Sequence, residues 1–177
     1  MKKIIYPVAI ALIIFTSAFA VITSVSWKIA DGYSIKFTSN DPAGVFTSLK
    51  GDVVFDENNL GASKFDVKVD VASINTGNGL KNDKAKSAQW FDSQTYPEIK
   101  FISSKITKSG DKYEAKGSLT MHGITKQITI PFSFSKTASG GVFTSSFDVN
   151  RNDYKIGEPG GHASEVLKID LSVPVSK

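Results

Sequence analysis

The chain has 177 residues, of which 41% are hydrophobic and 21% charged, a composition typical of one globular domain that can bury a core without cross-links. It contains no cysteine, which excludes disulfides, thiolate metal sites and cysteine nucleophiles. The formal charge is +4, but Arg151 is the only arginine and the lysines are scattered, so a nucleic-acid partner, which usually requires a clustered basic face, is not expected.

Residues 1–20 have the organisation of a secretory signal peptide. A pair of lysines precedes the apolar run Ile4 to Phe15, and Ala18-Phe19-Ala20 supplies a small-x-small cleavage site. The alternative is an uncleaved membrane anchor, because no charged residue separates the lysine pair from Lys28. Cleavage near Ala20 would leave residues 21–177 as a periplasmic or secreted domain.

The rest of the chain is dominated by period-two alternation, which places one face of a strand in an apolar interior and the other in water. Eight such segments follow one another: 26–37 (interrupted at Asp31-Gly32), 45–55, 65–71, 99–106, 113–121, 124–134, 142–151 and 167–175. Between the third and fourth segments, residues 80–92 contain good helix formers and no β-branched residue, which predicts a short helix.

The clearest element is a β-hairpin formed by segments 113–121 and 124–134. His122-Gly123 separates its two arms, where a two-residue turn favours residues that tolerate positive φ. The histidine is therefore interpreted as a turn residue and not as a catalytic base.

Reaction chemistry has little support in the sequence. The second histidine, His162, lies near Glu158 and Glu165 in a Gly-rich loop, where a solvated loop explains it better than a metal site. No nucleophile elbow such as G-x-S-x-G occurs. We therefore assign no catalytic residue, no metal ligand and no cofactor, and we do not expect an enzyme.

Eight amphipathic strands with mostly local connections predict an all-β fold, an eight-stranded antiparallel up-and-down barrel with a helical insertion between strands 3 and 4. A two-sheet sandwich satisfies the same alternation. Small side chains alternate with bulky ones at the inward positions, which leaves open either an elongated apolar cavity or a filled core. The small inward positions are Thr47, Gly51, Ser103, Ala115, Gly117 and Ser145.

Several separated motifs resemble one protein family. They are Ser73–Asn78, Ser87 with Trp90-Phe91-Asp92, Tyr96–Ser104, the run Gly117–Lys126 (similar to G-x-L-T-x-H-G-x-T-K) and Asn150–Gly157 (similar to R-x-D-[FY]-x-I-G). On these motifs the chain resembles the YceI-like family of exported lipid-binding proteins. The resemblance implies a lipocalin-like barrel with a long apolar pocket for a polyisoprenoid, an isoprenoid quinone, or a fatty amide or acid.

One segment departs from the family pattern. Many relatives have an Arg-Asp-x-His-Leu run where this chain has Lys81-Asn82-Asp83-Lys84-Ala85. A head-group or metal role of that histidine therefore does not transfer to this chain.

These observations predict an exported carrier that holds a long-chain apolar ligand in the barrel; the alternative is a filled-core structural or partner-binding barrel of the envelope. The candidate ligand-binding residues are Phe37, Phe55, Phe101, Ala115, Gly117, Leu119, Phe143 and Phe147 of the strands, with Trp90 and Phe91 of the helical insertion closing one mouth. The sequence leaves open a transient contact with a membrane and the oligomeric state, including a homodimer.

Overall fold

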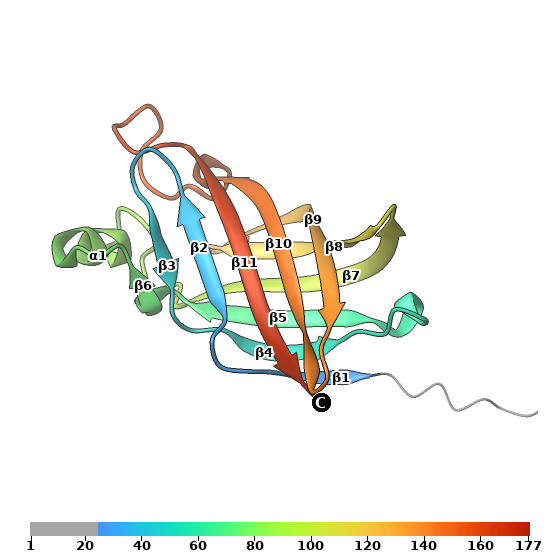
Figure 1. Ribbon diagram of the computed structural model, residues 1–177. Coiled ribbons are helices and arrows are strands. Elements are labelled where there is room, and N and C mark those ends of the chain that lie inside the picture. Colours follow the sequence, from blue (N-terminus) through green and yellow to red (C-terminus); the bar gives the residue numbers. More distant parts are fainter. Residues whose placement is uncertain (1–24) are drawn as a thin grey trace, which may run out of the picture.

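The protein is a closed antiparallel β-barrel (Figure 1). This architecture comes from a computed structural model that describes residues 25–177, so the predicted signal peptide or anchor lies outside the described residues. The helix α1 (Gly79–Lys86) lies at one end of the barrel, and β1 (Ser26–Ile29) and the C-terminus lie toward the other.

Several of the predicted strands are divided. The first consists of β1 and β2 (Ser34–Thr38), the second of β3 (Gly44–Phe46) and β4 (Lys50–Val54), and the third of β5 (Lys64–Asp70) continued by β6 (Ile74–Asn75). The other five are β7 (Glu98–Ser109), β8 (Lys112–Met121), β9 (Ile124–Lys136), β10 (Gly140–Asn150) and β11 (Val166–Ser176). Three short 3-10 turns, η1 (Leu60–Ala62), η2 (Val71–Ser73) and η3 (Arg151–Tyr154), complete the elements.

Pairing of the last strand with the first closes the barrel. The order is β1-β4-β5-β7-β8-β9-β10-β11, and β11 pairs back onto both β1 and β2. Val175 faces Ile29 across one junction, and Ile169 faces Phe37 across the other. The predicted eight-stranded antiparallel barrel is therefore confirmed, and the sandwich alternative is not adopted.

A side chain beside the interruption in the first strand pairs the backbone groups at the interruption in the second. Gly32 has φ of +86°, which ends β1 and turns the chain before β2. Between β3 and β4 the regular pairing of strands is interrupted. There the Tyr33 hydroxyl donates to the Thr47 carbonyl (2.9 Å) and accepts from the Leu49 amide (3.1 Å). The backbone groups freed by the break are thus still paired.

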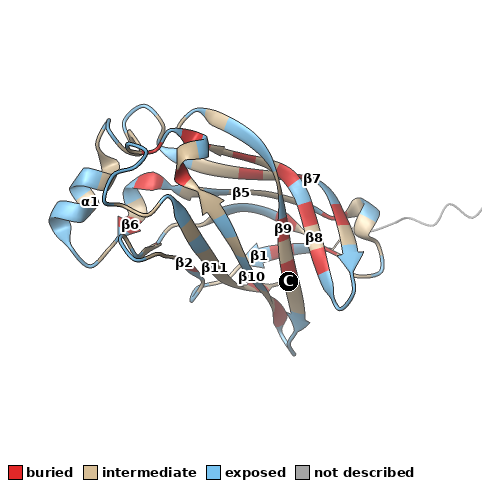
Figure 2. Cartoon of the chain, turned by 90° about the horizontal axis from the view of Figure 1, so that it is seen from above, coloured by how far each residue is buried: buried red, intermediate tan, exposed pale blue. Residues whose placement is uncertain are grey.

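The β8–β9 hairpin has the predicted two-residue turn. Met121 pairs with Ile124, and His122 and Gly123 between them have φ of 49° and 71°, the left-handed pair that a type I′ turn requires. Buried residues alternate along β8, as Figure 2 shows, because one of its faces lines the barrel interior. The His122 ring packs edge-on against Tyr96, with 4.9 Å between ring centroids.

The predicted helix over 80–92 is shorter than expected. Asn78 caps α1 by accepting from the Lys81 amide (3.1 Å), and the helix ends at Lys86. Ser87 donates its hydroxyl to the Lys84 carbonyl (2.7 Å) and takes up extended geometry, which competes with further helical turns. Trp90 and Phe91 consequently lie in the turns after the helix and not on it.

Candidate ligand-binding cavity

A cavity of about 610 Å³ occupies the barrel interior. Apolar side chains from all eight strands line it, and inward residues of β10 and β11 such as Phe147, Leu171 and Val173 are only half-buried although they point away from the outer surface. A close-packed core would bury such side chains almost completely. The inward-facing side chains of the strands therefore surround an empty space, and its volume lies within the range of ligand pockets.

One end of the cavity is closed by a cluster of aromatic rings, which we call the aromatic floor. Phe55, only 1% exposed, lies at its centre and contacts five of the other rings at centroid distances of 5.1–6.3 Å. The floor consists of Trp27, Phe55, Phe65, Tyr113, Phe132, Phe134 and Phe143. Most of these pairs are edge-to-face or tilted, the arrangements that aromatic quadrupoles favour.

A polar group secures the outer side of this floor. Glu57 accepts hydrogen bonds from the Tyr113 hydroxyl (3.0 Å) and from Lys136 Nζ (2.6 Å). The bond from Lys136 is the main reason that the pKa of Glu57 is lowered, and burial is the main reason that the pKa of Tyr113 is raised. Tyr113 thus presents its ring to the floor and its hydroxyl to a charged partner.

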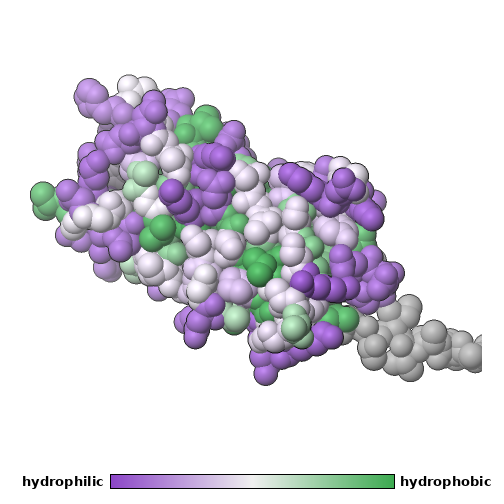
Figure 3. Space-filling model, viewed as in Figure 1, coloured by the Kyte–Doolittle hydropathy of each residue, from purple (hydrophilic) through white to green (hydrophobic). Residues whose placement is uncertain are grey.

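The opposite end, which we call the mouth, is polar. It lies between α1, the 39–42 loop and the 156–163 loop, and the charged and polar side chains that line it are Asp41, Lys81, Lys84, Gln89, Glu158 and His162. In Figure 3, hydrophilic residues gather over α1 and the loops beside it. The cavity therefore changes from apolar at the floor to polar at the mouth.

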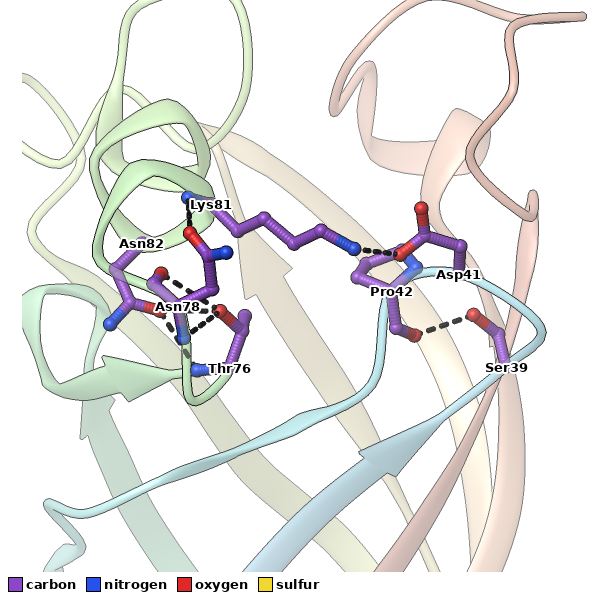
Figure 4. A network of polar contacts seen from close by, with 7 residues as sticks. All are labelled: Ser39, Asp41, Pro42, Thr76, Asn78, Lys81 and Asn82. Carbon is purple, nitrogen blue, oxygen red and sulfur yellow. Dashed lines mark hydrogen bonds and ion pairs between the residues drawn. The ribbon is translucent and has the colours of Figure 1, made fainter.

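A network of polar contacts crosses the mouth (Figure 4). Lys81 of α1 forms an ion pair of 2.7 Å with Asp41 of the 39–42 loop. On the helix side, Asn82 Oδ1 accepts from both the amide and the hydroxyl of Thr76, at 2.8 and 2.7 Å. The Lys81–Asp41 pair is the side-chain link between α1 and the loop opposite it.

Arg151 organises the third side of the mouth. Its side chain is 2% exposed and uses all five of its N–H donors. They reach the carbonyls of Ile156, Glu158, Ala163 and Ser164 and the side-chain oxygen of Asn152, at 2.6–3.1 Å. The guanidinium also lies 5.3 Å from the centroid of the Trp90 ring. One side chain thus holds the 151–165 segment in its fold.

Sequence analysis missed this role of Arg151. The composition did contain a signal, because every other basic residue apart from the histidines is a lysine. A single arginine in such a chain indicates a site that needs the planar guanidinium and its five hydrogen-bond donors.

The structure separates the ten predicted binding residues into two groups. Eight line the cavity: Phe37, Trp90, Phe91, Phe101, Ala115, Leu119, Phe143 and Phe147. Phe55 and Gly117 do not. Phe55 lies beneath the lining, in the middle of the aromatic floor.

Gly117 serves the contact between strands. A Cβ at this position would collide with the backbone oxygen of Ile102 and lie 2.7 Å from Ser103 Cα, next to the irregularity in the β7–β8 pairing. Gly51 has the same relation to the backbone oxygen of Asp66. These glycines permit close approach of the backbones, and the expectation that they create interior room is corrected.

The other small positions also differ from expectation. Thr47 is exposed, and the Ser103 hydroxyl accepts from the Phe65 amide (2.8 Å) and lies outside the lining. Among the six small positions only Ala115 and Ser145 border the cavity.

Within residues 25–177, no three His, Cys, Asp or Glu side chains lie close enough together to hold a metal ion. The same part of the chain has no buried side-chain nitrogen or oxygen without a hydrogen-bond partner. None of its helices has the length and apolar character needed to cross a membrane.

Comparison with known proteins gives consistent matches. Residues 22–175 match the family model described as the YceI-like domain. A UPF0312 protein of Pseudomonas putida strain F1 is 34% identical over 157 residues, which cover 84% of this chain and 78% of the relative.

Two solved structures share the fold. BcnA of Burkholderia cenocepacia has a TM-score of 0.76 at 23% identity, covering 85% of this chain and 100% of that one. A polyisoprenoid binding domain from Saccharophagus degradans has a TM-score of 0.59 at 13% identity, covering 85% of this chain and 93% of that one.

Proposed function

Because the chain belongs to the YceI-like family, we propose that it is an exported carrier that binds the hydrocarbon chain of a lipid inside its barrel. The observation that carries the proposal is the cavity of about 610 Å³, apolar on its walls and floor and polar at its mouth. An amphiphile has the same distribution of polarity, with an apolar tail and a polar head.

Burial of apolar surface supplies the driving force. Each methylene removed from water contributes about 0.8 kcal/mol, so ten of them contribute about 8 kcal/mol. This offsets a substantial part of the roughly 4–15 kcal/mol that association costs in lost freedom of motion. A preformed cavity adds little ordering cost to that figure.

The class of ligand is part of the proposal. The similar domain of Saccharophagus degradans is described as polyisoprenoid binding, and a polyisoprenoid is one candidate for this chain. An isoprenoid quinone and a fatty amide or acid are the others. The proposed role is binding without catalysis, and a transient contact of the mouth with a membrane would let the lipid exchange.

Native mass spectrometry of protein purified from its own host tests the proposal. We expect a bound species that dissociates on organic extraction and whose mass identifies a lipid. We also expect added prenols or fatty acids to raise the melting temperature of the extracted protein. Protein that carries no lipid and whose melting temperature no such ligand changes would refute the carrier function.

Export is tested separately from binding. Sequencing of the mature N-terminus should give a start near Val21. A start at Met1 would reject cleavage and favour the anchor, without affecting the proposal about the cavity.

A further inference from the structure

The sides of the mouth differ in how firmly they are held. One side is formed by residues 76–96, which contain α1 and the turns after it and which we call the flap. Lys84, Trp90 and Phe91 are among its side chains that line the cavity. The other side is formed by the 39–42 loop and the 151–165 segment, which we call the rim. In Figure 1, α1 lies outside the strands at the end of the barrel.

The flap is nearly self-contained in its hydrogen bonds. The amides of Phe91 and Ser93 donate to carbonyls of α1, at 3.0 and 3.1 Å, so the turns fold back onto the helix. Among the described residues, the contact of Lys81 with Asp41 is the only hydrogen bond or ion pair of residues 78–96 that leaves the flap (Figure 4). The flap can therefore move as a unit and keep its backbone groups paired.

Few apolar contacts hold the flap in place. No residue of α1 is buried, and Leu80 is 83% exposed. Phe91 packs edge-on against Phe46, with 6.1 Å between the ring centroids, and Trp90 lies beside the guanidinium of Arg151. Both of these flap side chains are only half-buried. The ion pair that links the flap to the rim is exposed, and such pairs contribute little to stability. Segments with so few buried contacts open locally in folded proteins.

The rim, by contrast, is fixed to the barrel. Arg151 binds four carbonyls of the 151–165 segment, and Tyr154 and Ile156 are each 2% exposed within the main core cluster. The Ser164 amide donates to the Asp41 carbonyl (2.7 Å), which joins the two parts of the rim. Movement of the rim would therefore expose buried side chains and break buried hydrogen bonds, whereas the flap can move with its own bonds intact.

The flap has a hinge position near each end. Gly77 has φ of +76° and open space around it, so its backbone can rotate without a clash. Near the other end Asp92 has φ of 45°, and the Tyr96 ring after it remains packed edge-on against His122 of the β8–β9 turn. Rotation at a few such loop residues is enough to move a rigid segment.

We propose that the flap is the gate of the cavity and that the ion pair of Lys81 with Asp41 is its latch. α1 and the turns after it swing away from the rim as one unit, while the rim stays in place. The inference rests on the proposed carrier function for what passes through the gate, but the movement itself belongs to the ligand-free protein.

Cross-linking tests which side of the mouth moves, because a chain without cysteine accepts a single introduced pair. Lys81→Cys with Asp41→Cys is joined by a bismaleimide whose linker contains a reducible disulfide. Lys126→Cys with Asp153→Cys is the matched control, since it replaces another exposed Lys–Asp pair (2.8 Å), which joins β9 to η3 of the rim. Stopped-flow fluorescence measures uptake and release of cis-parinaric acid, a fluorescent fatty acid, by the delipidated protein.

We expect the flap cross-link to slow uptake and release by about tenfold or more, relative to the same protein after reduction of the linker. The rim cross-link should change both rates by less than about twofold. Slowing by the rim cross-link alone, or by both cross-links to the same degree, would overturn the assignment of the gate. Unchanged rates in both proteins would overturn it as well.

A distance measurement on ligand-free protein tests the movement even if the probe does not bind, a result that would count against the carrier function and not against the gate. Spin labels on Ala88→Cys of the flap and Lys116→Cys of β8 report the flap, and labels on Asp153→Cys and Lys116→Cys report the rim. All three positions are exposed. Double electron–electron resonance should give the flap pair a second, longer distance or a distribution about twice as wide as that of the rim pair. A single distance with equal widths for the two pairs would overturn the gate.

Discussion

Replacement of Arg151 by methionine should destabilise the barrel at its mouth. Methionine fills similar space but donates no hydrogen bond, so four backbone carbonyls and the Asn152 side chain lose their partner. The carbonyls of Glu158 and Ala163 lie in a partly exposed loop and regain water, whereas Ile156 is 2% exposed and its carbonyl does not. One buried carbonyl left without a partner costs about 1–3 kcal/mol, and a hydrogen bond from a charged donor contributes about 1.5–3 kcal/mol.

Several oxygens lose their donor at once, while relief of the desolvation of the guanidinium offsets part of that loss, so we expect the free energy of unfolding to fall by about 3 kcal/mol. In a domain of this size each kcal/mol shifts the melting temperature by about 2–4 °C, so we expect a decrease of about 6–12 °C. Thermal and urea unfolding followed by circular dichroism measure it. Arg151→Lys keeps the charge and up to three donors, and should fall between wild type and Arg151→Met. A loss below about 1 kcal/mol in Arg151→Met would refute the organising role of the guanidinium.

Three further variants test other parts of the structure. Gly117→Ala should lower the free energy of unfolding by about 1–3 kcal/mol, because the new methyl group collides with the backbone of the neighbouring strand. Gly79→Ala, which has open space around it, should leave the stability in urea unchanged or increase it. Lys81→Met should speed release of a bound lipid in stopped-flow measurements, because the exposed ion pair of Lys81 links the two sides of the mouth. The same variant should change the free energy of unfolding by less than about 1 kcal/mol. Lys68→Met, which breaks an exposed ion pair on the barrel wall, should leave the release rate unchanged. Glu57→Gln should be less stable than wild type above pH about 4.3. The difference in stability should vanish as the pH falls through the lowered pKa of Glu57, because the carboxylate then loses its charge. A difference that persists in acid would contradict the role of that charge.

Alternation predicted the barrel because it is a direct consequence of strand geometry. Leu119 and Met121 of β8 are buried and line the cavity. Lys116, which lies between the inward positions 115 and 117 of the same strand, is exposed, as a period of two residues requires. The turn at His122-Gly123 was equally predictable, since few residue pairs adopt its φ values. The helix was predictable in place but not in length, because the hydroxyl of Ser87 decides where it ends.

The contents of the barrel were less predictable than its walls. A small side chain at an inward position predicts either room or close contact, and only the distance between backbones distinguishes the two. Ala115 borders empty space, whereas Gly117, two residues along the same strand, touches the neighbouring strand. Phe55 and Phe101 have the same inward parity, yet one lies within the floor and the other lines the cavity. The contacts of Arg151 depend on a loop that folds around it, which no local pattern encodes.

The chain has two tryptophans, and the barrel places one near each end of its cavity. Trp27 is buried in the aromatic floor, edge-on to Phe134 and with Lys177 Nζ 6.0 Å from its ring centroid, while Trp90 lies at the mouth near the cations of Lys84 and Arg151. Their intrinsic emission should therefore differ in colour and in access to iodide, the floor residue being bluer and protected. The protein contains its own pair of reporters, so that arrival of a tail and settling of a head group can be timed separately without any label.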